Sequence, residues 1–307
     1  MRVQYLLSAL PLLAPKSQKI VISNDDGWAV AQIRAQFDSL KDAGYEVILS
    51  APAQNQSGTG SRSKTATDMR EPCEYESCRV GSPAVGFNET DPRLNYVNAY
   101  PVDAARHGIQ TLSPKFWSSK PDLLVSGPNV GRNLNVQVFF SGTIGAACEA
   151  AQQGVPAIAF SGQSTEHVSY TTLASDPTSE ATLAAHAYAS LTTTFVNTFL
   201  SSPSASLPPN TIISVNYPPL HNRSNCARKE DVKWVFTRTF PTIWRADMDI
   251  CGNNGKLPTE SEVVGYDEGC YASVSVLSAT SKMDAGKEAQ QEVLKTLGSL
   301  GFVCFAH

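Results

Sequence analysis

Two adjacent carboxylates stand directly after a short apolar run near the start of the chain. Residues 19–23 are mostly β-branched and apolar, which is typical of a buried strand, and the tetrapeptide Asn-Asp-Asp-Gly at 24–27 follows at once. Asp25 and Asp26 are costly in such a place, because like charges repel and each loses water. Mg²⁺ or Mn²⁺ would compensate them, since hard cations prefer carboxylate, amide and hydroxyl oxygens. The same tetrapeptide also suits a plain turn, with Asp26 as a helix N-cap.

Two more polar loops are expected at the same edge of a sheet. The apolar run 46–51 predicts a second strand, and its loop contains Asn55 and Ser57; the run 121–127 predicts another, with Asn129 in its loop. Ligands in open α/β sheets bind where the carboxyl ends of parallel strands meet, so the three loops converge. Together they supply two carboxylates, a hydroxyl and an amide oxygen, which suits one Mg²⁺-like ion.

A fourth polar element opens a helix. Ser141, Gly142 and Thr143 precede a run of small residues that predicts a helix to about residue 153. Free backbone N–H groups at a helix N-terminus are a natural site for a phosphate dianion. A metal beside an anion site is the layout needed to hydrolyse a phosphate ester, and Asp25 or Asp26 would position the attacking water or take its proton.

The order of the predicted elements indicates an α/β fold with a doubly wound, mostly parallel, Rossmann-like sheet. Residues 19–51 read as strand, helix and strand, a βαβ unit whose crossover is right-handed. Further strands are predicted at residues 156–161 and 211–216, and a longer helix at 179–200. Residues 62–98 do not continue this alternation of strands and helices, and we expect them to form an insertion or hairpin that closes over the site.

The chain divides into three parts on this interpretation. Residues 1–16 have a positive start, an apolar run and small residues, which predicts a secretory signal peptide; an ordinary buried N-terminal element is the alternative. Residues 17–219 form the catalytic core. Residues 220–307 form a C-terminal arm with a hairpin and a final helix, which either joins copies of the chain or packs on its own core. No other segment is long and apolar enough to span a membrane, so the mature protein is expected to be soluble. The predicted signal peptide indicates that it is secreted.

Seven cysteines fit an oxidising compartment. Cys73 and Cys78 bracket a short loop and are predicted to form a disulfide, whereas Cys148 lies in the small-residue helix and is predicted to be a buried free thiol. The pairing of the other four stays open: Cys226, Cys251, Cys270 and Cys304. Three sequons, at Asn55, Asn88 and Asn222, permit glycosylation.

Composition limits the partners. Hydrophobic residues make up 42% of the chain and charged residues 17%, as in an ordinary globular protein, and the formal net charge is -4. Without a basic stripe, a nucleic-acid polymer is not expected, whereas a small phosphate ester is compatible with this charge. None of the five histidines lies in the converging loops, so ordinary surface or core roles are expected for them.

The ordered set of motifs resembles the SurE (survival protein) family of metal-dependent phosphatases and nucleotidases. The resemblance runs from about Lys19 to Pro218 and rests on four stretches: Ser-Asn-Asp-Asp-Gly at 23–27, Ala-Pro at 51–52 with Asn-Gln-Ser-Gly at 55–58, the segment 125–133, and the segment 140–147. Each stretch is weak alone, and the set in this order and spacing is specific.

The resemblance implies a site and an activity. It implies metal ligands at Asp25, Asp26, Ser57 and Asn129. It implies catalytic roles for Asp25, Asp26, Asn55 and Ser126. It implies a phosphate pocket lined by Asn55, Gly127, Ser141, Gly142 and Thr143. It also implies a homodimer or higher homo-oligomer that exchanges the arm, and hydrolysis of nucleoside monophosphates or other phosphomonoesters, as in a 5'(3')-nucleotidase or acid phosphatase.

The sequence departs from the family pattern at places that bear on substrate choice. Pro128 and Asn135 replace an aliphatic residue and a glycine, and residues 62–98 do not match closely. A secreted ester hydrolase or sugar deacetylase on the same scaffold is therefore the alternative, and a ligand-binding module without turnover is a third reading. Asn55 is both pocket residue and sequon, and we expect it to stay unmodified because a glycan would obstruct the metal site.

Overall fold

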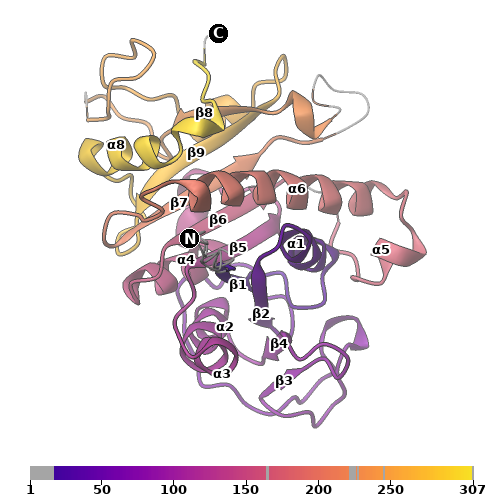
Figure 1. Ribbon diagram of the computed structural model, residues 1–307. Helices are drawn as coiled ribbons and strands as arrows, with labels where there is room; N and C mark the ends of the chain where they lie inside the picture. Colours follow the sequence, from indigo (N-terminus) through magenta and orange to yellow (C-terminus); the bar gives the residue numbers. More distant parts are fainter. Residues whose placement is uncertain (1–16, 164–165, 221–225, 227, 245, 306–307) are drawn as a thin grey trace, which may run out of the picture.

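The structure is a computed structural model that describes residues 17–163, 166–220, 226, 228–244 and 246–305 (Figure 1). The predicted signal peptide, residues 1–16, and the sequon at Asn222 lie outside these residues. In the described part of the chain, no helix has the length and apolar character needed to cross a membrane.

One sheet of nine strands forms the centre of the described molecule, in the order β3-β4-β2-β1-β5-β6-β7-β9-β8. Neighbouring strands from β4 to β7 are parallel. The central strands are β1 (Lys19–Ser23), β2 (Glu46–Pro52), β5 (Leu123–Val130), β6 (Ala157–Gly162) and β7 (Thr211–Tyr217). The predicted α/β class, with a doubly wound and mostly parallel sheet, is confirmed.

Helices cover both faces of the sheet (Figure 1). Ile20 and Ile22 of β1 belong to the apolar core under α1 and α6, whereas Val21 belongs to the core on the other face, against α2 and α4. Side chains alternate along a strand, so an unbroken apolar run is what a sheet buried on both faces requires. The helices are α1 (Ala31–Asp42), α2 (Pro101–His107), α3 (Ser113–Trp117), α4 (Gly142–Gln152), α5 (Thr172–Ser175), α6 (Glu180–Ser201), α7 (Glu260–Val264) and α8 (Lys287–Thr296).

The segment 62–98 adds a hairpin to one edge of the sheet. β4 (Leu94–Val97) pairs parallel with β2, and β3 (Val85–Phe87) pairs antiparallel with β4. The hairpin expected within this segment is therefore present, and it extends the core sheet at the β2 edge.

The C-terminal segment differs from the expected hairpin arm. β9 (Tyr271–Ser278) pairs antiparallel with β7, and β8 (Lys233–Thr237) pairs parallel with β9, so both strands continue the core sheet and do not form a hairpin with each other. A parallel pair cannot be joined by a tight turn. The long connection between the two strands instead carries α7, which packs against β9.

Three disulfides are formed: Cys73–Cys78, as predicted, Cys226–Cys270 and Cys251–Cys304. Cys148 is free and buried in α4, also as predicted, and burial raises the pKa of its thiol to about 11. The thiol therefore stays protonated at neutral pH and is a poor nucleophile toward the disulfides.

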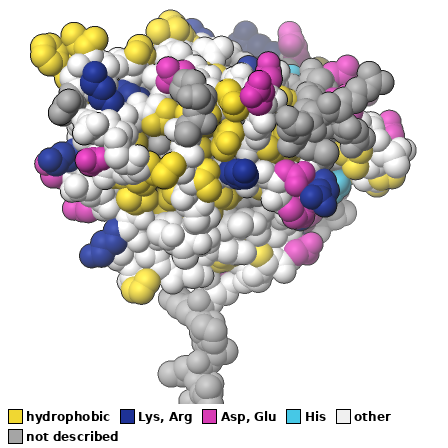
Figure 2. All heavy atoms as spheres, turned by 90° about the horizontal axis from the view of Figure 1, so that it is seen from above, with side chains coloured by type: hydrophobic (Ala, Val, Ile, Leu, Met, Phe, Trp, Pro, Cys, Tyr) yellow, Lys and Arg dark blue, Asp and Glu magenta, His cyan; other side chains and the backbone are white. Residues whose placement is uncertain are grey.

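Charges of both signs are mixed on the face of the molecule seen in Figure 2. Lys and Arg side chains stand singly or in small groups there, among acidic, apolar and uncharged side chains. The described side chains on this face form no continuous basic surface of the kind that binds the phosphate backbone of a nucleic acid.

Candidate active site

The turn after β1 buries both carboxylates at the carboxyl edge of the sheet. Asn24 shapes the turn, because its side-chain nitrogen donates to the Gly27 carbonyl and its oxygen accepts from the Gly27 N–H. Gly27 has a φ of 112°, a conformation that favours glycine. Asp25 and Asp26 are only 3% and 0% exposed, so neither is a solvent-facing turn residue.

The start of α4 lies directly on Asp25. The Gly142 N–H donates to Asp25 Oδ2 at 2.9 Å, and the Thr143 hydroxyl donates to Oδ1. A Cβ at position 142 would lie 2.8 Å from the Asp25 Cβ and 2.7 Å from the Pro101 Cγ, so only glycine allows this approach. Ser141 is the N-cap, and its hydroxyl accepts the Ile144 N–H. In this structure the anion held by the helix start is the Asp25 carboxylate.

The Asp25 carboxylate is not fully compensated by these contacts. Burial, and next the charge of Asp26, raise the pKa of Asp25 to about 6, although hydrogen bonds from Thr143 and Gly142 act in the opposite direction. A buried acid that stays hard to ionise despite such donors lacks positive charge nearby. This environment suits a bound cation.

Asp26 has a partner that the sequence analysis did not anticipate. Its Oδ2 accepts the Val130 N–H at 2.9 Å, and its Oδ1 lies 2.8 Å from His167 Nε2. The hydrogen bond to Asp26 raises the pKa of His167. The sequence analysis considered only the loops after three strands, and on that basis it expected an ordinary surface or core role for His167. His167 lies in the loop after β6, and this loop reaches the same edge of the sheet.

The end of β5 brings Asn129 to the same place. The sequence predicted that this strand ends at Gly127, but β5 continues to Val130, with a register shift between Ser126 and Asn129 that accommodates the glycine and Pro128. Asn129 is 8% exposed, and its Oδ1 lies 3.3 Å from the Thr143 hydroxyl, which also contacts Asp25. Asn129 is therefore connected to Asp25 through one shared hydroxyl.

The backbone around Ser126 and Gly127 is tightly packed. Gly127 has a φ of 106°, and a Cβ there would collide with the Phe160 carbonyl oxygen. The hydroxyls of Ser126 and of its register partner Ser23 are buried and have no hydrogen-bond partner within the described residues. Ser126 is thus next to the site in the sheet, and its predicted catalytic role stays a prediction.

The loop after β2 is attached on two sides. The Gln56 N–H donates to the Asp25 carbonyl at 2.7 Å, and the Gly60 N–H donates to the Phe140 carbonyl at 2.8 Å. Asn55 Oδ1 accepts the Ser57 N–H, and both side chains are exposed. The loop is thus placed beside Asp25 and the start of α4, with Asn55 and Ser57 open to an incoming ligand.

The donor set fits a hard cation. Among the residues that the structure describes, no three His, Cys, Asp or Glu side chains gather as a metal site. A metal would therefore rely on the two carboxylates together with neutral oxygens such as Asn129 Oδ1, which is the ligand chemistry that Mg²⁺ and Mn²⁺ accept. Zinc prefers nitrogen and sulfur ligands, and the site is poor in both.

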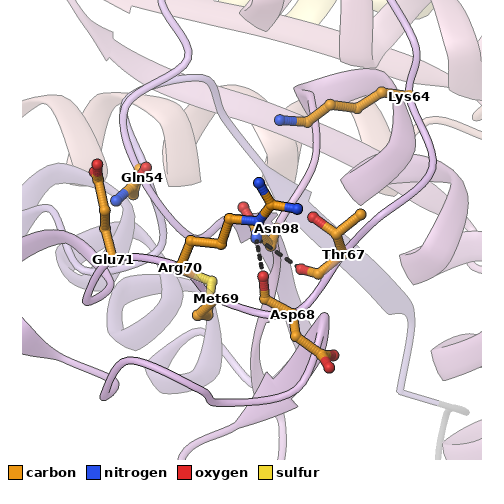
Figure 3. Close-up of a pocket in the computed structure, with 8 residues that line it drawn as sticks. All are labelled: Gln54, Lys64, Thr67, Asp68, Met69, Arg70, Glu71 and Asn98. Atoms are coloured by element: carbon orange, nitrogen blue, oxygen red, sulfur yellow. Dashed lines mark hydrogen bonds between the residues drawn. The ribbon is translucent and has the colours of Figure 1, made fainter.

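A separate pocket lies in the insertion (Figure 3). Its lining is polar apart from one methionine, and Gln54 connects it to the loop that carries Asn55. It is lined by Gln54, Lys64, Thr67, Asp68, Met69, Arg70, Glu71 and Asn98. Figure 3 shows Asn98 donating to the backbone carbonyls of Thr67 and Asp68, which fixes one wall of the pocket.

Known proteins with similar sequences are named as phosphatases and nucleotidases. An acid phosphatase of Yarrowia lipolytica is 34% identical over 300 residues, which cover 90% of this chain and 83% of that protein. A 5'-nucleotidase SurE of Methanococcoides burtonii is 39% identical over 151 residues, 49% of this chain and 51% of that protein. The chain thus aligns with about half the length of the second relative.

A solved structure and a family model complete the comparison. The crystal structure of a SurE protein from Aquifex aeolicus superposes with a TM-score of 0.57 at 22% identity, covering 92% of this chain and 99% of that one, which shows a shared fold. The family model described as survival protein SurE matches residues 20–246. The match includes Asp25, Asp26, Asn129 and His167, and the chain belongs to the SurE family.

Proposed function

We propose that this SurE-family protein is a metal-dependent phosphomonoester hydrolase of the acid phosphatase or 5'(3')-nucleotidase type. The observation that carries the proposal is the buried Asp25–Asp26 pair, in which Asp25 lies against the N-terminus of α4 and shares the Thr143 hydroxyl with Asn129. The names of the similar proteins support the hydrolase class, since they are an acid phosphatase and 5'-nucleotidases.

Each residue has a distinct task in this proposal. Asp25, Asp26, Ser57 and Asn129 hold Mg²⁺ or Mn²⁺. When bound, such an ion supplies positive charge beside the phosphoryl group and favours the ionisation of water. Asp26 is kept in one orientation by the Val130 N–H and by His167, so that it positions the attacking water or takes its proton.

The phosphate is held next to the aspartates. Asn55 and the turn at Ser126 and Gly127 line one side of its pocket, and Ser141, Gly142 and Thr143 form the wall at the start of α4. The positive end of the helix dipole stabilises negative charge there. The same field acts on the charge that develops on the phosphoryl oxygens during hydrolysis.

Phosphate release should require a divalent metal. We expect the purified chain to release phosphate from AMP and from an aryl phosphate, and we expect EDTA to lower the rate at least about a hundredfold, because a metal contributes several kcal/mol of charge stabilisation. Added Mg²⁺ or Mn²⁺ should restore it. Release of acid from acyl esters without release of phosphate would favour the ester hydrolase or deacetylase instead, and metal binding without turnover of any ester would favour a binding module.

We place the protein outside the cell. Three disulfides support an oxidising compartment, and we propose that residues 1–16 are removed as a signal peptide. The mass of the protein purified from culture medium would show whether this leader is absent and whether a sequon such as Asn88 carries a glycan.

We also propose that copies of the chain associate through residues 220–307. Ile243 and Trp244 in this segment are 79% and 73% exposed, which is unusual for large apolar side chains of a monomer. Sedimentation equilibrium should therefore report a dimer or larger oligomer, and the double variant Ile243→Ser, Trp244→Ser should shift it toward the monomer. A monomeric wild-type protein at micromolar concentration would contradict this association.

A further inference from the structure

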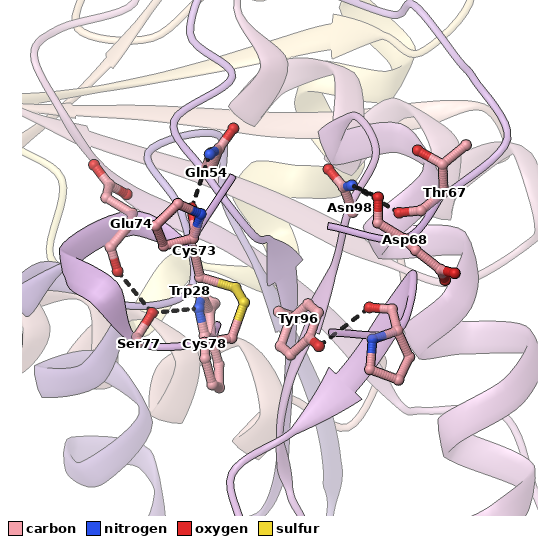
Figure 4. The surroundings of a disulfide bond; sticks show 12 residues. Trp28, Gln54, Thr67, Asp68, Cys73, Glu74, Ser77, Cys78, Tyr96 and Asn98 are labelled. Carbon is pink, nitrogen blue, oxygen red and sulfur yellow. Dashed lines mark hydrogen bonds between the residues drawn. A yellow bond between two sulfur atoms is a disulfide. The ribbon is translucent and has the colours of Figure 1, made fainter. Parts of the chain in front are cut away.

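A short disulfide-closed loop stands at the edge of the candidate site. This disulfide loop, residues 73–78, is attached to the loops after both β1 and β2 (Figure 4). The Glu74 N–H donates to the Ala53 carbonyl at 3.0 Å, and the Trp28 indole N–H donates to the Ser77 hydroxyl at 3.0 Å. The Ser77 hydroxyl in turn donates to the Glu74 carbonyl at 2.6 Å. The loop is therefore fixed relative to the aspartates.

The backbone of this loop adopts an uncommon conformation. Tyr75 and Glu76 have φ values of 55° and 56°, in the left-handed region that residues with a side chain seldom occupy. Such conformations cost free energy, so surrounding contacts must hold them, and they concentrate at functional sites. Here the Cys73–Cys78 disulfide and the hydrogen bonds of Glu74 and Ser77 hold the loop.

The Glu74 carboxylate lies against the turn that carries the two aspartates. Its Oε2 is so close to the backbone of Gly27, the residue after Asp26, that a Cβ there would collide with it. Oε2 is buried and has no hydrogen-bond partner in the described part of the chain. A buried acceptor without a donor is costly, and a ligand that brings a hydroxyl would remove that cost.

Tyr75 offers an aromatic ring in the same loop, directly after Glu74 in the sequence. The residue is 39% exposed, so the ring is open to solvent and to a ligand that reaches the loop. The pocket of Figure 3 has no aromatic residue in its lining, so it provides no comparable surface.

We propose that the disulfide loop is the leaving-group subsite of the phosphomonoesterase, where Tyr75 stacks on a flat ring and Glu74 accepts a hydrogen bond from a hydroxyl of the leaving group. This inference rests on the proposed function and goes beyond it, because it assigns leaving-group recognition to residues of the insertion. The preferred ester would combine an aromatic ring with a hydroxyl, as a ribonucleoside does.

Removing the ring should cost activity only toward esters that contain a ring. We expect Tyr75→Ala to lower kcat/KM for AMP about ten- to hundredfold, the usual range for the loss of base stacking, and to change kcat/KM for glycerol 3-phosphate less than twofold. Tyr75→Phe keeps the ring and should retain most of the activity. Phe87→Ala removes another exposed aromatic side chain of the insertion, 54% exposed, and should change neither rate.

Removing the carboxylate should cost activity only toward esters that contain a ribose hydroxyl. We expect Glu74→Ala to lower kcat/KM about tenfold for AMP and less than twofold for 2',3'-dideoxy-AMP, because an analogue that lacks the hydroxyl has no contact to lose. If the subsite depends on the closed loop, the double variant Cys73→Ser, Cys78→Ser should show the same preference changes as Tyr75→Ala and Glu74→Ala.

The outcomes separate this inference from the proposed function. Equal losses on AMP, glycerol 3-phosphate and dideoxy-AMP would contradict the subsite and leave the phosphatase intact. Unchanged rates in Tyr75→Ala and Glu74→Ala would contradict it equally. If the wild-type protein released phosphate from none of the three esters in the presence of metal, the proposed function itself would be wrong, and the subsite with it. Thermal unfolding of each variant checks that the fold is retained.

Discussion

Replacing Asp25 with asparagine should lower kcat/KM for phosphomonoesters about a thousandfold, because Asp25 is a proposed ligand of a metal ion that would supply several kcal/mol of charge stabilisation in the transition state. The rate of phosphate release from AMP at saturating Mg²⁺ measures the loss. The folded state should not suffer. Asp25 is buried beside Asp26, and burial and that neighbouring charge raise its pKa to about 6, so a neutral side chain relieves repulsion.

A matched substitution separates loss of the site from loss of a charge. Asp91→Asn removes a carboxylate that pairs with Lys41 at the surface, and it should leave kcat/KM within about twofold of the wild-type value, because exposed pairs contribute little. Asp25→Asn with a normal melting temperature and more than a tenth of the wild-type activity would exclude Asp25 from the catalytic centre.

The second large effect is a pH dependence of the free energy of unfolding that comes from the buried acid Glu260. Glu260 at the start of α7 is 0% exposed, and burial raises its pKa to about 8, although hydrogen bonds from Asn135, Ser275 and Thr239 oppose the shift. Below its ordinary pKa of 4.5, Glu260 is protonated in the folded and the unfolded protein and contributes no pH dependence. Between 4.5 and about 8 the folded state binds more protons, so stability falls as pH rises.

The loss should be large enough to measure by urea unfolding at several pH values. The free energy of unfolding should fall by about 1.4 kcal/mol per pH unit, and the total loss above pH 8 should be on the order of 5 kcal/mol. Glu260→Gln should flatten the curve, because the amide cannot ionise. Glu262→Gln changes an exposed glutamate of the same helix and should keep the wild-type slope. Parallel pH curves for wild type and Glu260→Gln would show that Glu260 is ionised in the folded protein.

The sheet was predictable because its strands are apolar on both faces. Ile20, Val21 and Ile22 alternate between two cores, and a run of this kind has few other stable environments. Asp25 and Asp26 could be singled out as candidate site residues from the sequence. Two carboxylates at the end of a buried strand are costly unless a cation or another partner compensates their charge. The small residues around Gly142 also indicated the start of α4, where the structure shows close packing on Asp25.

Other features depend on distant contacts that local patterns do not encode. His167 meets Asp26 only because the loop after β6 returns to the same edge, and no local spacing links the two residues. The parallel pairing of β8 with β9 depends on the connection through α7, since two alternating segments fit a hairpin equally well. Gly127 and Pro128 predicted the end of β5, but a register shift lets the strand continue to Val130.

The position of α7 bears on whether the chain can be divided. The stretch that joins Asn129 to the start of α4 is anchored by the C-terminal segment: the Asn135 N–H donates to Glu260, the Asn135 side chain donates to Ser261, and Arg132 donates to the Val264 carbonyl. A fragment that stops at residue 219 would keep every proposed ligand and lose these three anchors. We therefore expect catalytic competence to need the intact polypeptide, even though every proposed metal ligand lies in its first half.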